Sequence, residues 1–283
     1  MPKKDLAYLL AKKQAHEPIV MLTCYDYLTA RIQDEAGIDS IFVGDSVGTN
    51  VLGYTSETEV TMDDMLHHLR AVRRGVQNAY LLVDLPAGSY ETPALALKNA
   101  RRFMEVGADG VKLEGGIERV EVVQTLTAAG IQVCGHIGYT PQTLGPKGRV
   151  QGRSLEQGKA LLRAALALEQ AGIGLLVLEL VSEPISRLIT RQLSIPTIGI
   201  GSGRFCDGQV LVVTDILGLA PGERKMLKRY DHLHERYMDA FTRYKDEVRQ
   251  RLFPGAENAF NKIADEDLAH LEQWVEQGMP AGE

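Results

Sequence analysis

Four acidic residues in this sequence each stand at the end of a short apolar segment that has the composition of a buried strand. Glycines beside them, such as Gly44, allow the backbone to approach a ligand closely. If these segments are neighbouring parallel strands, their ends meet at one face of the protein and the carboxylates gather there. We therefore expect an acidic, cation-binding cluster made of Asp45, Asp84, Glu114 and Glu179.

Three of these acids, Asp45, Asp84 and Glu114, supply the hard oxygen ligands that suit Mg²⁺. A bound Mg²⁺ accepts the carboxylate and keto oxygens of a 2-oxo acid and, as a Lewis acid, makes the adjacent C–H more acidic, which gives access to an enolate. One such acid by itself is more often a helix cap or half of a salt bridge. Three at successive strand ends favour a metal site.

Two basic residues lie in or just after predicted strands. Lys112 precedes Glu114 by two positions, so both side chains point to one side of a strand. Lys112 then either donates to a carboxylate or enolate oxygen of the substrate or forms a structural ion pair. His136 stands where the fifth predicted strand ends, and this position suits a donor to the substrate.

Glu179 is the candidate general base. Leu178 and Leu180 flank it, and an acid in apolar surroundings is suited to take the proton beside the keto group. The alternative is a structural ion pair, for instance with Arg187 or Arg191.

Eight short apolar segments alternate with helical patterns along the chain, and eight is the number of strands in a closed parallel barrel. Capping signals at Thr61-Met62-Asp63-Asp64 and at Ser154-Leu155-Glu156-Gln157 each open a helix, and Gly107 and Gly130 each end one. We therefore predict a (β/α)₈ or TIM barrel. The predicted strands are Val20–Thr23, Ser40–Val43, Tyr80–Val83, Gly110–Leu113, Gln132–Cys134, Leu175–Leu178, Thr197–Ile200 and Leu211–Val213.

The predicted barrel is a single domain at residues 1–255 that begins with a surface helix, and residues 256–283 form a C-terminal helical extension. Helices are predicted over His232–Leu252 and Ala256–Trp274. The long loops Gly48–Glu59 and Tyr139–Arg153 follow the second and fifth strands, where loops of a barrel cover the active site.

Composition narrows the range of partners. The 283 residues carry a formal net charge of -6 without a long basic run, which argues against nucleic acid or an anionic membrane. The 3 cysteines are widely spaced and indicate neither a disulfide framework nor a zinc site. The sequence begins without the apolar segment of a signal peptide and contains no apolar stretch of membrane-spanning length, so we expect a cytoplasmic protein with a small-molecule ligand.

A series of motifs occurs in order between about residues 12 and 254. They are TCYDY at 23–27, VGDS at 43–46, VLGY at 51–54, VTMDDM at 60–65, GSY at 88–90, VKLEGG at 111–116, GHIG at 135–138, TPQ at 140–142, VQGR at 150–153, IPTIGIG at 195–201 and DGQVLV at 207–212. Together they make the sequence similar to the ketopantoate hydroxymethyltransferases, the first committed enzymes of pantothenate biosynthesis.

This resemblance implies a Mg²⁺-dependent (β/α)₈ barrel that assembles into a homo-oligomer, a decamer. The implied reaction transfers the one-carbon unit of 5,10-methylenetetrahydrofolate to 3-methyl-2-oxobutanoate and gives 2-dehydropantoate. Matched by motif, Asp45 and Asp84 would hold the metal and the oxo acid bound to it, with Glu114 beside the metal. The same matches make Ser46, Lys112 and His136 contacts of the oxo acid and Glu179 the base.

Several positions depart from the family pattern. Thr49 and Asn50 replace an apolar pair, Ala87 a Phe and Tyr139 a Leu, and the loop Thr143–Arg149 is shorter. These changes near the rim of the pocket motivate a second hypothesis, a Mg²⁺-dependent carboligase or lyase acting on another 2-oxo acid, like the phosphoenolpyruvate mutase and isocitrate lyase group. A third hypothesis, a barrel without catalytic function, predicts an incomplete ionisable set, whereas the set is complete here.

Overall fold

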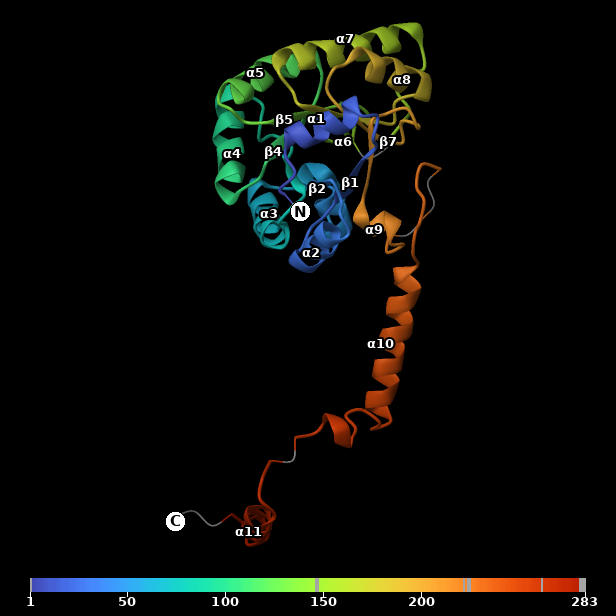
Figure 1. Ribbon diagram of the computed structural model, residues 1–283. Helices are drawn as coiled ribbons and strands as arrows, with labels where there is room; N and C mark the ends of the chain where they lie inside the picture. Colours follow the sequence, from blue (N-terminus) through green and yellow to red (C-terminus); the bar gives the residue numbers. More distant parts are fainter. Residues whose placement is uncertain (1, 146–147, 221, 223–224, 261, 280–283) are drawn as a thin grey trace. The chain divides into compact units, whose positions relative to one another are not determined.

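The first of two compact units, Met1–His232, is a closed barrel of eight parallel strands (Figure 1). Each strand pairs with the next in the sequence, and β8 pairs with β1. This computed structural model describes residues 2–145, 148–220, 222, 225–260 and 262–279. It confirms the predicted (β/α)₈ barrel. The strands are β1 (Ile19–Thr23), β2 (Ser40–Val43), β3 (Tyr80–Asp84), β4 (Gly110–Glu114), β5 (Val133–Gly138), β6 (Leu175–Glu179), β7 (Thr197–Ile200) and β8 (Gly208–Leu211).

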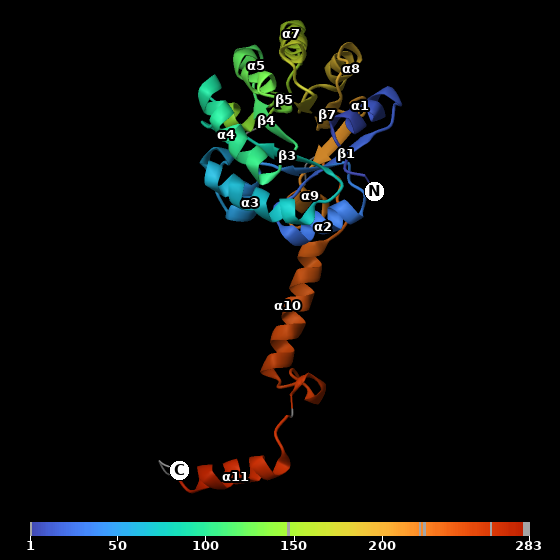
Figure 2. The same cartoon turned by 60° about the vertical axis from the view of Figure 1, so that its left-hand side comes forward.

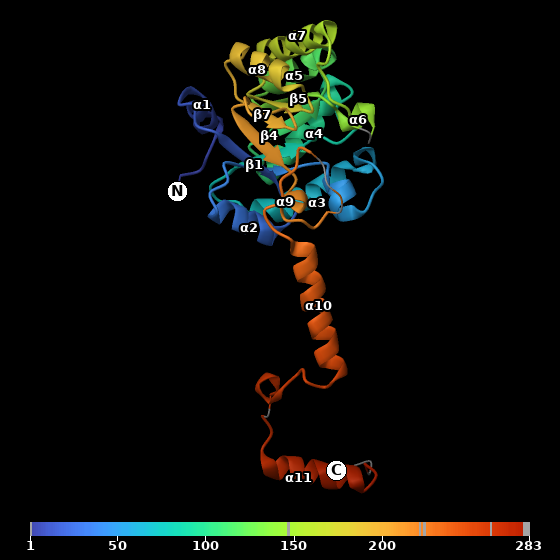
Figure 3. The same cartoon turned by 90° about the vertical axis from the view of Figure 1, so that its right-hand side faces the viewer.

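Helices surround the strands, as Figure 2 shows for α4, α5, α7 and α8. Figure 3 shows α1 and α6 on opposite sides of the barrel. The helices of this unit are α1 (Leu6–Gln14), α2 (Tyr27–Glu35), α3 (Met62–Gly75), α4 (Pro93–Val106), α5 (Val120–Ala128), α6 (Pro141–Leu144), α7 (Leu155–Ala171), α8 (Glu183–Gln192) and α9 (Val213–Ile216). Shorter turns are η1 (Gly48–Leu52), η2 (Glu57–Glu59) and η3 (Ile117–Arg119).

Local capping explains where several helices begin. The Thr61 hydroxyl accepts from the backbone N–H of Asp64, and the Asp64 carboxylate accepts from the backbone N–H of Thr61, so the predicted capping box of α3 is confirmed. Ser154 caps α7 through the backbone N–H of Gln157. The predicted box is incomplete there, because the Gln157 side chain accepts from the backbone of Arg153 instead.

The side chains inside the barrel change from apolar to charged along its axis. Leu9 of α1 packs against an apolar interior layer at the N-terminal ends of the strands, formed by Ile19, Met21, Phe42, Tyr80, Leu82, Cys134, Leu175, Val177, Ile198 and Val210. Two residues further along β3, β4 and β5, the interior positions are Asp84, Glu114 and His136. Because alternate residues of a strand face one side, Lys112 and Glu114 both point inward. The charged layer therefore lies at the C-terminal ends of the strands, beside the loops.

Two strand predictions differ from the structure by more than one residue at an end. β5 runs to Gly138 instead of ending at Cys134, because it pairs with β6 as far as Glu179. The last strand is β8, Gly208–Leu211, whereas the sequence pattern predicted Leu211–Val213. Gly208 lies so close to β1 that a Cβ atom there would be 2.5 Å from the carbonyl oxygen of Ile19, and its position in the strand reflects this approach.

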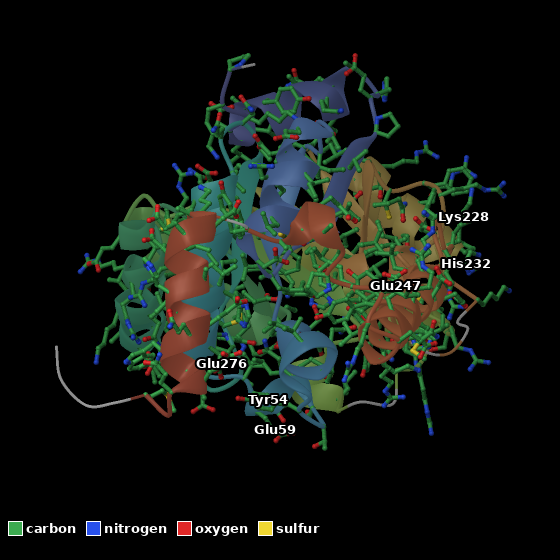
Figure 4. The ribbon with its side chains drawn as sticks, turned by 90° about the horizontal axis from the view of Figure 1, so that it is seen from below. Tyr54, Glu59, Lys228, His232, Glu247 and Glu276 are labelled. Carbon is green, nitrogen blue, oxygen red and sulfur yellow. The ribbon has the colours of Figure 1, made fainter. Side chains whose placement is uncertain are left out.

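The second unit, Leu233–Glu283, contains α10 (Leu233–Arg249), the turn η4 (Ala256–Asn258) and α11 (Asp265–Glu276). Figure 4 labels Glu247 on α10 and Glu276 on α11. Neither helix has a buried residue among those described. The helix predicted over Ala256–Trp274 is thus interrupted, and α11 begins where three acidic residues meet the helix N-terminus, a position that the helix dipole favours.

Residues 146 and 147, which belong to the predicted loops Tyr139–Arg153 and Thr143–Arg149, lie outside the described residues. In the part of the chain that the structure describes, no helix is long and apolar enough to cross a membrane.

Candidate active site

Strand register brings the predicted site residues together. Asp84 of β3 stands opposite Lys112 of β4, and Glu114 of β4 stands opposite His136 of β5. Glu179 of β6 stands opposite Gly138, the last residue of β5. A Cβ atom at Gly138 would lie 2.2 Å from the carbonyl oxygen of Glu179, so glycine is required for this close approach. The interior positions of β3 to β6 therefore form one layer of ionisable groups.

Asp84 joins two neighbouring strands to the segment after β2. Its Oδ1 accepts a hydrogen bond from the Lys112 ammonium, and its Oδ2 accepts from the backbone N–H of Asp45 at 3.0 Å. The side chains of Asp84 and Lys112 are 1% and 5% exposed. The ammonium also lies 5.3 Å from the centre of the Phe42 ring, within the range of a cation–π contact.

His136 lies between two carboxylates. Its Nδ1 is 3.2 Å from Oε1 of Glu114, and its Nε2 is 3.4 Å from Oε2 of Glu179. Both are ion-pair contacts, and neither nitrogen reaches hydrogen-bond geometry with any residue that the structure describes. The predicted base Glu179 therefore contacts His136. Among the described residues, it forms no ion pair with Arg187 or Arg191. Its side chain is 17% exposed, which makes it the most accessible acid of this layer.

The fourth acid, Asp45, is held from the loop after β5. Gln142 of α6 donates its side-chain amide to Asp45 Oδ2 at 2.7 Å, and its backbone N–H donates to Glu114 Oε2 at 3.1 Å. Tyr90 donates to the amide oxygen of Gln142. Reasoning from single residues missed both Gln142 and Tyr90, although each belongs to a motif that carries the family resemblance. Their membership of the motifs GSY at 88–90 and TPQ at 140–142 is the sequence signal that could have marked them as site residues.

Ser46 lies at the edge of the acidic layer, beside Asp45. Its hydroxyl shares a hydrogen bond of 2.8 Å with the phenol of Tyr25, which follows β1. Tyr25 was not among the predicted site residues. Its contact brings the loops after β1 and β2 together next to the cluster.

Burial and mutual charge shift the pKa values in this layer. Burial and then repulsion from Asp84 raise the pKa of Asp45 well above its usual range. Burial likewise raises the pKa of Asp84, and the Lys112 ammonium offsets this effect in part. Burial opposes a charge on Lys112, but attraction to Asp84, Glu114 and Asp45 outweighs it, so the pKa of Lys112 is raised.

The pKa values of Glu114 and His136 move apart. Burial favours neutral Glu114, yet the attraction of His136 and Lys112 outweighs it and lowers the pKa of Glu114. Burial and Lys112 disfavour the charged form of His136, but Glu114 and Glu179 outweigh them and raise the pKa of His136 to about 9. We conclude that His136 carries a proton near neutral pH and can act as a hydrogen-bond donor.

Four carboxyl groups in this layer face one lysine and one histidine, so negative charge is in excess even with His136 protonated. Among the described residues, no group of three or more His, Cys, Asp or Glu side chains is arranged to hold a metal ion. Two of the expected ligand oxygens are engaged within the protein, because Lys112 binds Asp84 Oδ1 and Gln142 binds Asp45 Oδ2.

The positions that depart from the family pattern lie in the loops around this layer. Asn50 of η1 donates to the carbonyl of Ser46 at 3.0 Å and accepts from Thr214 of α9 at 2.7 Å, while Thr49 donates to Glu57. These hydrogen bonds thus connect η1 to α9 and to η2. Figure 4 labels Tyr54 and Glu59 on the same segment between β2 and α3.

The other two departures line separate cavities at the rim. Ala87 lines a cavity of about 380 Å³ whose other lining residues are Thr58, Glu59, Val60, Thr61, Met62, Pro86, Gly88, Ser89, Leu95 and Asn99. Tyr139 lines a cavity of about 260 Å³ with Leu144, Arg149 and Gln151.

The class defined by the fold and the buried layer is a (β/α)₈ barrel with a layer of acidic side chains at the C-terminal ends of its strands. A 2,3-dimethylmalate lyase of the PEP mutase/isocitrate lyase superfamily is similar in fold, with a TM-score of 0.57 and 14% identity over 98% of each chain. A phosphonopyruvate hydrolase solved as a complex with oxalate and Mg²⁺ has a TM-score of 0.60 and 12% identity, over 95% of this chain and 98% of that one.

Sequence comparison identifies the family. Residues 3–256 match the family model described as ketopantoate hydroxymethyltransferase, and the chain belongs to that family. It is 51% identical over 256 residues to the 3-methyl-2-oxobutanoate hydroxymethyltransferase of Thermotoga neapolitana, covering 89% of this chain and 94% of the relative. It is 46% identical over 276 residues to the enzyme of that name from Syntrophomonas wolfei, covering 96% of this chain and 100% of the relative. The predicted family and enzyme class, a hydroxymethyltransferase, are confirmed.

Proposed function

We propose that this protein is a Mg²⁺-dependent 3-methyl-2-oxobutanoate hydroxymethyltransferase that takes its one-carbon unit from 5,10-methylenetetrahydrofolate and produces 2-dehydropantoate. Family membership and the names of the relatives support the transfer reaction and the oxo acid. The observation that carries the mechanism is the buried layer in which His136 joins Glu114 to Glu179 beside the Asp84–Lys112 pair. The folate donor and the metal rest on the family resemblance.

The residues present fit a divalent cation in the chemistry of their donors, and a bound cation would have to draw the carboxylates closer together than they lie in the described residues. Their donors are carboxylate oxygens, which Mg²⁺ prefers, and the negative charge of the layer exceeds its positive charge. Burial and then repulsion from Asp84 raise the pKa of Asp45, and a cation bound between the two carboxylates would relieve that repulsion. We assign Asp45 and Asp84 as ligands with Glu114 beside them. When bound, the metal supplies Lewis-acid activation of the keto group.

The chain's own residues account for the proton transfer. Glu179, at the accessible edge of the layer, takes the proton from C3 of the oxo acid, and the C–H electron pair passes into the enolate. Lys112, His136 and Ser46 donate hydrogen bonds to substrate oxygens. The enolate carbon then forms a bond with the methylene carbon of the donor, and the bond from that carbon to the first folate nitrogen breaks. Water displaces the second folate nitrogen and becomes the hydroxyl of the product, and the proton taken from C3 and one proton of that water go to the two nitrogens of the released tetrahydrofolate.

The test is exchange of the C3 proton of 3-methyl-2-oxobutanoate in D₂O, followed by NMR with and without Mg²⁺ and tetrahydrofolate. We expect Mg²⁺-dependent exchange, followed by product formation when the methylene donor is added. Glu179→Gln should abolish exchange and leave Mg²⁺ affinity nearly unchanged, and retained exchange would remove Glu179 as the base. Absence of exchange together with turnover of another 2-oxo acid would favour the carboligase or lyase hypothesis.

The resemblance also supports a cytoplasmic homo-oligomer, and we propose a decamer. Analytical ultracentrifugation of the full chain distinguishes a decamer from smaller assemblies.

A further inference from the structure

The side-chain amide of Gln142 is completely satisfied by the active site. Its Nε2 donates to Asp45 Oδ2 at 2.7 Å and to the carbonyl of Leu85 at 3.1 Å. Tyr90 accepts from the backbone N–H of Glu114 at 3.3 Å, so its own proton is free to go to Gln142 Oε1. This chain of donors settles the orientation of the amide, because a flipped amide would direct its oxygen at the Asp45 carboxylate.

The backbone of the same residue holds a second carboxylate. The N–H of Gln142 donates to Glu114 Oε2 at 3.1 Å. One residue of α6 thus binds two of the expected metal ligands from outside the barrel. Glycines with positive φ stand on either side of this turn, at Gly138 (φ 103) and Gly145 (φ 72). They let the chain leave β5, cross the layer and turn back.

The turn also encloses the carboxylates. Asp45 and Glu114 are 6% and 2% exposed with Gln142 in this place. α6 packs against η2 from the loop after β2, so two loops from different parts of the chain meet over the layer. An amide at this point excludes water without adding a charge. A carboxylate or an ammonium in the same place would add one.

We propose that Gln142 is a positioning residue, which orients the Asp45 and Glu114 carboxylates for the cation and ties α6 to the closed site. The inference rests on the proposed function, since it assigns these carboxylates to metal binding. Tyr90 has the dependent role of holding the amide of Gln142 in its working orientation. Neither residue contacts the reacting atoms in this scheme.

The first test measures Mg²⁺ binding to the folded protein by isothermal titration calorimetry, without substrates. We expect Gln142→Ala to weaken Mg²⁺ binding by about 10- to 100-fold, the usual effect of removing a group that orients a metal ligand. In steady-state assays, kcat should fall more than KM for the oxo acid rises. The matched control is Gln170→Ala at an exposed position of α7, which should leave both quantities at their wild-type values.

The second test is a double-mutant cycle for Mg²⁺ affinity. Tyr90→Phe should weaken binding less than Gln142→Ala does, and the two substitutions together should weaken it by less than the sum of their separate effects, because both remove the hydrogen bond between Tyr90 and Gln142. Thermal unfolding of each variant separates positioning from stability. A purely structural role would lower the melting temperature and leave the Mg²⁺ affinity of the folded variant unchanged.

The outcomes separate this inference from the proposed function. Wild-type protein that binds Mg²⁺ together with a Gln142→Ala variant of equal affinity would overturn the role of Gln142 alone. Additive effects of the Tyr90 and Gln142 substitutions would overturn the coupling between them. Wild-type protein that binds no Mg²⁺ would overturn the metal site and, with it, this inference.

Discussion

Replacing Lys112 by Met tests the electrostatic design of the buried layer. The ammonium is paired with Asp84 where both side chains are almost completely buried, and a Met of similar length keeps the contact with Phe42. Removing one partner of a buried pair leaves an uncompensated charge and costs about 3–5 kcal/mol. The ratio of folded to unfolded protein should therefore fall by roughly two to three and a half orders of magnitude.

Equilibrium unfolding in urea at several pH values measures this cost. Burial already raises the pKa of Asp84, and without Lys112 it should rise further. A carboxyl whose pKa is higher in the folded than in the unfolded protein binds its proton more tightly in the folded state. Lowering the pH therefore increases the free energy of unfolding through this group. The destabilisation by Lys112→Met should therefore shrink from pH 8 to pH 5.

The double variant Asp84→Asn with Lys112→Met provides the control. It removes both charges, so it should be more stable than Lys112→Met alone, although less active. If Lys112→Met unfolds at the wild-type urea concentration at pH 8, or if the double variant is the less stable of the two, the stranded-charge explanation is wrong.

Three further predictions concern the framework of the site. Gly138→Ala should abolish C3 proton exchange and lower the free energy of unfolding by more than about 2 kcal/mol, because its Cβ would meet the Glu179 carbonyl; NMR exchange and urea unfolding report the two effects. Ser202→Ala should cost about 1 kcal/mol in urea unfolding, since its buried hydroxyl donates to the Leu178 carbonyl and accepts from the Val181 N–H; an unchanged midpoint would contradict this. Thr61→Ala should cost about 1 kcal/mol by removing the cap of α3 and leave Mg²⁺ affinity unchanged, and a calorimetric change in affinity would show that the cap acts on the site.

Particular residues show how far the sequence pattern reached. Lys112 and Glu114 were predicted on one side of a strand from their spacing, and both are inside the barrel. Of the two roles that the sequence left open for Lys112, the structure shows the ion pair with Asp84, and the substrate contact remains part of the proposed function. The clustering of Glu179 with Glu114 follows from strand register, with His136 between them.

The residues that sequence reasoning missed act across long separations. Gln142 is 97 positions from Asp45, and its place in the site depends on how the loop after β5 folds back over the barrel. The range of β8 was mispredicted for a related reason, since pairing with β1, nearly 200 residues earlier in the sequence, selects Gly208–Leu211 over the more apolar residues that follow.

By itself, the sequence determined the features that depend on neighbours along the chain: the alternation of strands and helices, the N-terminal caps of α3 and α7, and the acids at the strand ends. Periodicity and capping are local, so short stretches of residues specify them. The tertiary structure decided which charged groups form ion pairs, where β8 lies, and which loop residue reaches Asp45. Those features depend on distances between residues far apart in the chain, which are set when the barrel closes.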